Sequence, residues 1–144
     1  MNLQKSADAH TKVLIVDSDP VIVKAIAAEL RLAGYETLKA VGGGEAIALV
    51  RQEKPDLIVL DLNVSPDIHS VPSDGYHIME CLRRVKESRT IPIITMTGNP
   101  DSLDMERNID LGAVGFLYKP LDYDELLRLV RGAVGAKAMV EMAA

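Results

Sequence analysis

Short runs of consecutive apolar residues alternate along the chain with longer segments in which apolar residues recur every three or four positions. The short runs are rich in β-branched residues, which is typical of strands buried on both faces of a sheet. The longer segments have the spacing of amphipathic helices. This pattern predicts strands at residues 13–16, 35–39, 57–60, 91–96 and 115–118.

A helix is expected after each strand, because residues that begin and end helices stand at the boundaries. Asp19 is placed to cap a first turn that Pro20 opens, and Gly34 closes that helix. The alternation predicts the α/β class, as a doubly wound, flavodoxin-like parallel sheet of five strands in the order 2-1-3-4-5 with five helices. The helices are expected at residues 20–33, 42–54, 75–85, 99–111 and 121–134.

Length, composition and charge limit the kinds of protein that this chain could be. The 144 residues suit one domain, and we expect a flexible segment at 1–11, the domain at 12–134 and a tail or the start of a linker at 135–144. A net charge of −5 and the absence of Trp argue against nucleic-acid binding. Charged residues interrupt every long apolar stretch, so no membrane span is expected. The single Cys81 fits a reducing cytoplasm.

Four polar residues stand where a predicted strand ends: Asp17, Asp61, Thr97 and Lys119. The carboxyl ends of parallel strands lie at one edge of the sheet, where ligands bind in open α/β folds. We therefore expect these side chains to converge. Carboxylates, a hydroxyl and a lysine suit phosphoryl transfer to a carboxylate, because oxygen ligands hold Mg²⁺ while the lysine and hydroxyl stabilise the transferred oxygens.

Four segments carry a resemblance to a known family: VLIVDSDP, PDLIVLDLN, IPIITMTG and GAVGFLYKP. In this order and spacing they resemble the receiver domain of bacterial two-component response regulators, over residues 12–134. Each segment alone is weakly specific, whereas the ordered set is specific. The resemblance implies a phosphoprotein of signal transduction, with Mg²⁺ as its cofactor and an aspartyl phosphate as its signalling state.

The resemblance implies a role for each matching residue. Asp61 matches the aspartate that accepts a phosphoryl group from a histidine kinase or phosphotransfer protein. Asp17 matches an acid of the metal site, and Asn63 matches the position whose backbone carbonyl binds the metal. Thr97 matches the switch hydroxyl, and Lys119 matches the lysine that pairs with the phosphoryl group.

Two further positions match the family's switch region. Phe116 matches an aromatic residue that turns inward on activation, and plain core packing is the alternative interpretation of this side chain. The peptide bond before Pro120 is often cis in this family. Thr97 likewise has a plainer interpretation as a strand residue, because Thr has a high strand propensity.

The sequence departs from the family pattern at two places. The family usually has two adjacent acids after the first strand, and the second commonly binds the metal, but Ser18 stands at that position. A neutral hydroxyl is a weaker ligand than a carboxylate, so we expect weaker Mg²⁺ binding. The ligand that the second acid usually provides would come from Ser18 itself, or from Asp19 through a water. We expect Asp19 mainly to cap the next helix. The loop at 64–73 is longer than usual, and we expect it to shield the site, alter the lifetime of the phosphoryl group or contact a partner.

Three functions are compatible with these residues. The first is a phosphorylation-controlled switch, whose partner is a downstream protein or an effector domain missing from the chain, with homodimerisation on activation left open. The second is a degenerate receiver that binds partners without phosphorylation, which Ser18 favours. The third is a phosphatase of the haloacid dehalogenase type, because the segment 17–19 has the Asp-x-Asp form; the acidic motif expected after the lysine strand is lacking. We expect a signalling domain rather than an enzyme.

Overall fold

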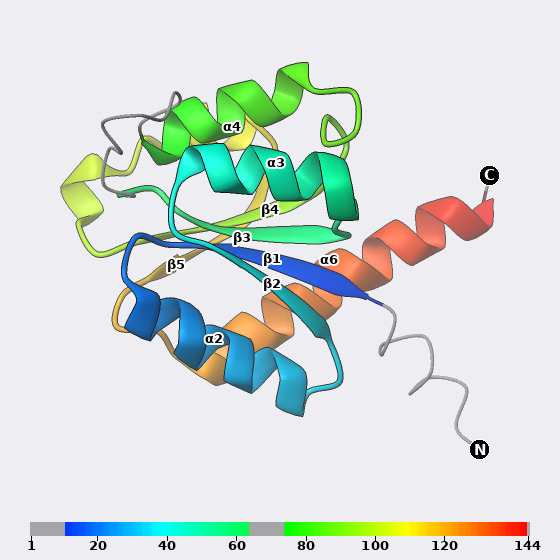
Figure 1. Ribbon diagram of the computed structural model, residues 1–144, viewed down its shortest axis with the longest axis horizontal. Coiled ribbons are helices and arrows are strands. Elements are labelled where there is room, and N and C mark those ends of the chain that lie inside the picture. Colours follow the sequence, from blue (N-terminus) through cyan, green and yellow to red (C-terminus); the bar gives the residue numbers. More distant parts are fainter. Residues whose placement is uncertain (1–10, 64–73, 144) are drawn as a thin grey trace.

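The chain forms a parallel β-sheet with helices packed on both faces (Figure 1). The computed structural model describes residues 11–63 and 74–143. Its five strands are ordered β2-β1-β3-β4-β5, which confirms the predicted doubly wound, flavodoxin-like α/β fold. The strands are β1 (Lys12–Val16), β2 (Glu36–Ala40), β3 (Leu57–Asp61), β4 (Ile93–Thr97) and β5 (Ala113–Tyr118). The helices are α2 (Pro20–Leu32), α3 (Gly43–Glu53), α4 (Gly75–Arg84), α5 (Met105–Asp110), α6 (Tyr123–Ala143) and the short 3-10 helix η1 (Pro100–Ser102).

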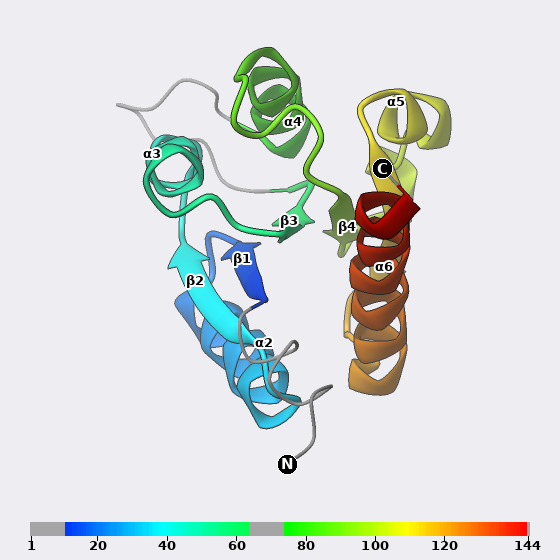
Figure 2. The same cartoon turned by 90° about the vertical axis from the view of Figure 1, so that its right-hand side faces the viewer.

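The central strands are apolar because each lies between two layers of helices. Helices α2 and α6 cover one face of the sheet, and α3 and α4 cover the other (Figures 1 and 2). Successive residues of a strand point to opposite faces. Accordingly Val13 and Ile15 belong to the core beneath α2 and α6, whereas Leu14 and Val16 belong to the core beneath α3 and α4. This double burial explains why β1 lacks the polar alternation of a strand with one solvent face.

Polar side chains begin the helices next to the carboxyl edge of the sheet. Asp19 caps α2, as predicted, by accepting a hydrogen bond from a backbone N–H of the first turn at 2.9 Å. Asp74 caps α4 in the same way at 2.9 Å. Gly75 follows, and a Cβ at this position would stand 2.4 Å from the Cα of Leu62. Helix α4 therefore starts directly against the residues that follow β3.

Two predicted helix boundaries are wrong. The helix predicted at 99–111 is two helices, η1 and α5, because Asp104 accepts the backbone N–H of Arg107 at 3.1 Å and starts a new helix there. The last helix was expected to end near Val134 but continues to Ala143. Residues after Gly135 are mostly strong helix formers, and neither Gly nor Pro ends the helix.

Several predicted segments fall at or beyond the limits of the described residues. In the segment 1–11, expected to be flexible, only Thr11 is described; it is buried, and its carbonyl accepts the N–H of Glu36 at 2.9 Å. The long loop at 64–73 lies outside the described residues. The predicted tail at 135–144 is helical as far as it is described.

Candidate functional site

The four polar residues at predicted strand ends lie together at the carboxyl edge of the sheet. Asp17 follows β1, Asp61 ends β3, Thr97 ends β4 and Lys119 follows β5. Backbone hydrogen bonds continue the sheet through these positions. The N–H of Lys119 donates to the carbonyl of Thr97 at 2.8 Å, and the N–H of Asp17 donates to the carbonyl of Ala40 at 3.1 Å. The sheet itself therefore places these side chains side by side.

Lys119 bridges two buried carboxylates at this edge. Its Nζ lies 2.6 Å from Oδ2 of Asp17 and 3.2 Å from Oδ2 of Asp61. The two acids are 1% and 3% exposed, so both carboxylates are held out of water. Each also accepts a backbone N–H at its other oxygen, Asp17 from Asp19 at 2.9 Å and Asp61 from Asn63 at 3.0 Å. Two acids and one lysine leave the cluster with an excess of negative charge.

The excess of negative charge affects how the groups titrate. Burial raises the pKa of Asp61, the charge of Asp17 adds to the rise, and the hydrogen bond from Asn63 and the charge of Lys119 oppose it. Burial alone would lower the pKa of Lys119, but its hydrogen bonds and charge interactions with Asp17 and Asp61 outweigh burial and raise that pKa. Lys119 therefore stays charged, but its single positive charge cannot balance the negative charges of both Asp17 and Asp61.

The hydroxyl of Thr97 is held by neighbours other than Asp61. It donates to Oδ1 of Asn63 at 2.7 Å or to the carbonyl of Asn99 at 3.0 Å, and it accepts the N–H of Asn99 at 3.0 Å. The contact with Asn63 was missed from the sequence, where Asn63 was considered only for its backbone carbonyl. A short amide side chain two residues beyond the acid was the available signal, but its direction depends on the fold.

Oxygen donors at this edge fit a hard cation. The carboxylates of Asp17 and Asp61 and the backbone carbonyl of Asn63 come from adjacent strand ends. Asp19 is exposed and its Oδ1 accepts a backbone N–H of α2, so its side chain serves as a helix cap. Ser18 is partly buried beside it. Among the described residues no three His, Cys, Asp or Glu side chains gather in a metal-binding arrangement.

The predicted switch residue Phe116 lies on β5. It is partly buried and packs edge-on against Tyr118, with ring centroids 5.7 Å apart and an interplanar angle of 84°. Tyr118 is 48% exposed, so this aromatic pair reaches the surface. The peptide bond between Lys119 and Pro120 is cis, as the resemblance implied.

The sequence and the fold both resemble those of known proteins. A family model described as the response regulator receiver domain matches residues 13–131. The chain belongs to the response regulator receiver domain family. This is a family of signalling domains rather than of classical enzymes. The family gives no support to the phosphatase hypothesis.

Curated relatives include short and long proteins. Protein PilH of Pseudomonas aeruginosa is 32% identical over 123 residues, which cover 85% of this chain and 97% of PilH. The DNA-binding dual master transcriptional regulator RpaA of Synechocystis sp. is 35% identical over 133 residues, which cover 92% of this chain and 53% of RpaA. The chain thus spans about half the length of RpaA and of several other curated relatives it matches.

Solved structures agree with this placement. The chemotaxis response regulator CheY4 of Vibrio cholerae superposes with a TM-score of 0.74 at 27% identity, covering 85% of this chain and 98% of CheY4. The receiver domain of sensor histidine kinase PA1611 from Pseudomonas aeruginosa, solved with magnesium in its active-site cleft, has a TM-score of 0.74 at 28% identity, covering 87% and 98%. No helix in the described part of the chain is long and apolar enough to cross a membrane.

Proposed function

We propose that this receiver domain is a phosphorylation-controlled switch with Asp61 as its phosphoacceptor. The observation that carries the proposal is the surroundings of Asp61: a buried carboxylate on a central strand, 3.2 Å from Lys119 Nζ, with Thr97 at the end of the adjacent strand. The donor is a histidine kinase or phosphotransfer protein, and the site of action is the cytoplasm. The output partner is a downstream protein or an attached effector domain.

In the proposed step, a carboxylate oxygen of Asp61 attacks the phosphorus of a phosphohistidine. An O–P bond forms, and the N–P bond breaks with its electron pair moving to the imidazole nitrogen. Lys119 already contacts the attacked carboxylate, so its charge lies where the phosphoryl oxygens arrive. Asp17 fixes the lysine from the other side at 2.6 Å and keeps it directed at Asp61.

Asp17, Asp61 and the backbone carbonyl of Asn63 would hold Mg²⁺. The ion commonly uses one or two carboxylates and completes its shell with water, which matches this donor set. Bound there, it supplies positive charge against the transferred phosphoryl oxygens. The magnesium seen in the PA1611 receiver domain supports the cofactor by similarity.

Thr97 and Phe116 would relay the change in charge at Asp61. A phosphoryl group presents new acceptor oxygens, which attract the Thr97 hydroxyl away from Asn63 and Asn99. Movement at the end of β4 alters the packing beside β5, where Phe116 and Tyr118 reach the surface. Partner binding would then follow a shift between two conformations of the domain.

Ser18 favours a second candidate, a degenerate receiver that binds a partner independently of phosphate. A hydroxyl in place of the second adjacent acid lowers the charge available to hold Mg²⁺. The intact arrangement of Asp61, Thr97 and Lys119 supports the first candidate instead.

Phosphorylation by a small-molecule donor separates the two candidates. The protein is incubated with acetyl phosphate, with and without Mg²⁺, and its intact mass is measured. We expect one added phosphoryl group in the wild type with Mg²⁺ and none in Asp61→Asn. Exposed Asp124→Asn serves as the matched control and should label as the wild type does. Labelling that persists in Asp61→Asn would overturn the assignment of the acceptor.

A further inference from the structure

Helix α5 is weakly anchored in the core. It spans Met105–Asp110, and Asn108 is its one buried residue. Met105 and Ile109 are 37% and 60% exposed, so apolar packing contributes little to holding this helix. Nδ2 of Asn108 donates to Oγ1 of Thr95 at 2.9 Å, while its buried Oδ1 has no hydrogen-bond partner among the described residues. A buried acceptor without a partner makes the observed position of α5 less favourable.

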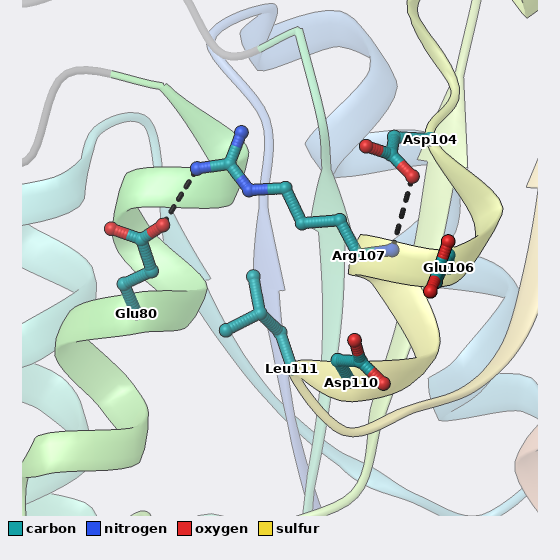
Figure 3. A pocket seen from close by; sticks show the side chains of 6 residues that line it. All are labelled: Glu80, Asp104, Glu106, Arg107, Asp110 and Leu111. Carbon is teal, nitrogen blue, oxygen red and sulfur yellow. Dashed lines mark hydrogen bonds and ion pairs between the residues drawn. The ribbon is translucent and has the colours of Figure 1, made fainter.

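Four residues hold the first turn of α5 against α4, and we call them the α4–α5 clamp: Tyr76, Glu80, Asp104 and Arg107. The hydroxyl of Tyr76 accepts the backbone N–H of Asp104 at 2.8 Å and lies 3.5 Å from its carbonyl. The guanidinium of Arg107 lies 4.6 Å from the centroid of the Tyr76 ring and 2.6 Å from Oε1 of Glu80. Figure 3 shows Glu80 on α4 and Arg107 on α5 pointing toward one another across a hollow.

The α4–α5 clamp lies at the far end of the segment that connects Thr97, at the end of β4, to the start of α5. The Thr97 hydroxyl donates to the backbone carbonyl of Asn99 and accepts the backbone N–H of the same residue. The side chain of Asn99 in turn caps η1, and Asp104 follows shortly after η1 and caps α5. One end of this segment therefore moves with Thr97, and the other is fixed by Tyr76. A shift of Thr97 toward Asp61 acts against the clamp.

The clamp is also attached to the acceptor strand. Tyr76 follows Gly75, which lies so close to the end of β3 that a Cβ there would stand 2.7 Å from the carbonyl oxygen of Asp61. The N–H of Gly75 donates to the carbonyl of Leu62 at 3.3 Å. Helix α4 is thus fixed relative to Asp61, and α5 is the element that must move.

We propose that the α4–α5 clamp is an autoinhibitory contact that stabilises the unphosphorylated conformation of this domain. The inference rests on the proposed function, because it needs a ligand at Asp61 that draws Thr97 inward. Loosening the clamp lowers the free energy needed to reach the second conformation, so the apparent affinity for a phosphoryl group or its mimic rises by the same factor.

Beryllofluoride, a phosphoryl mimic, tests this by calorimetric titration of the full chain in saturating Mg²⁺. Tyr76→Phe removes the hydroxyl but keeps the ring beneath Arg107, and Glu80→Gln removes the charge that pairs with Arg107. We expect each variant to bind the mimic roughly two- to tenfold more tightly than the wild type. Glu106→Gln is the matched control, because Glu106 lines the same hollow outside the clamp, and its affinity should equal that of the wild type.

Amide hydrogen exchange without the mimic gives a second readout. Residues 103–110 should exchange faster in Tyr76→Phe and Glu80→Gln, while the amides of β3 keep wild-type protection, which shows that the variants are folded. Wild-type affinity in both variants overturns the clamp and leaves the proposed function intact. If neither the wild type nor the variants bind the mimic, both the proposed function and the clamp are overturned.

Discussion

Burial of the Asp61 carboxylate lowers the free energy of unfolding when this group is charged. Burial raises the pKa of Asp61 in the folded chain above the ordinary value of 3.8. Between these two values the unfolded chain has already lost its proton, so the free energy of unfolding falls as pH rises through this window. Above this window the whole penalty is present. Lys119 offsets only part of it, because one lysine serves two carboxylates.

Asp61→Asn should therefore stabilise the protein at pH 7, by roughly 1 kcal/mol. The advantage over the wild type should shrink as pH falls through the raised pKa of Asp61. Urea unfolding at pH 7 and in mild acid measures both values. Exposed Asp124→Asn should change the free energy of unfolding by less than about 0.5 kcal/mol. An Asp61→Asn variant less stable than the wild type at pH 7 would contradict this account of the charge cluster.

Ser18 should limit the affinity for Mg²⁺. Ser18→Asp adds a carboxylate beside Asp17 and should raise Mg²⁺ affinity roughly tenfold, measured by calorimetric titration. Asp19→Asn is the informative companion, because Asn caps a helix as well as Asp does and α2 should stay intact. We expect Asp19→Asn to leave Mg²⁺ affinity unchanged. A fall in affinity would instead make Asp19 a metal ligand.

At this scale, the sequence located the site but not its contacts. Asp17, Asp61, Thr97 and Lys119 could be predicted to converge because each stands at a strand end, and parallel strands share one edge. The hydrogen bond from Thr97 to Asn63 could not be predicted, because it depends on the directions of two side chains from separate strand ends.

At the scale of elements, α4 depends on a glycine at its start. A Cβ on Gly75 would stand 2.4 Å from Leu62 Cα and 2.7 Å from the Asp61 carbonyl, and backbone atoms cannot move aside cheaply. Gly75→Ala should lower the free energy of unfolding by about 2 kcal/mol or more. Gly132→Ala is the control, because nothing lies within 4 Å of a Cβ there, and it should stabilise α6 by about 0.5–1 kcal/mol.

Chemical denaturation of both variants gives this comparison directly. Equal stabilities of Gly75→Ala and the wild type would show that α4 can shift away from β3, contrary to the fixed position the structure gives it. The clamp experiments also depend on that fixed position, since α4 is the reference against which α5 moves.

The presence of each helix and strand could be predicted from the sequence. The residue at which a helix begins could be predicted only where one capping residue stood out from its neighbours. Asp19 was expected to cap α2 and does so. The start of α4 at residue 75 was also predicted, and the structure shows that Asp74 caps it. Asp104 caps α5 just as clearly, but its neighbours Asp101 and Asn99 are equally good caps, so the break between η1 and α5 was missed. The tertiary contact with Tyr76 adds to the choice of Asp104, and no local pattern reports such a contact.

At the scale of the whole molecule, the sheet order brings residues more than a hundred positions apart into one ion pair, Asp17 with Lys119. A cation that binds only the folded chain stabilises the whole fold. Mg²⁺ at ten times its dissociation constant should raise the free energy of unfolding by about 1.4 kcal/mol. Thermal unfolding with and without Mg²⁺ measures this, and the rise should be lost in Asp17→Asn. An equal rise in that variant would place the ion elsewhere.

Phosphorylation at Asp61 is best tested by titrating the protein with Mg²⁺ and then with beryllofluoride while backbone amide chemical shifts are recorded. We expect saturable binding in the wild type that requires Mg²⁺, with shifts spreading from Asp61 and Thr97 to β5, and no mimic binding in Asp61→Asn. Absence of binding in the wild type, or the same binding in Asp61→Asn, would contradict phosphorylation at Asp61. The degenerate receiver would then be the better description of this domain.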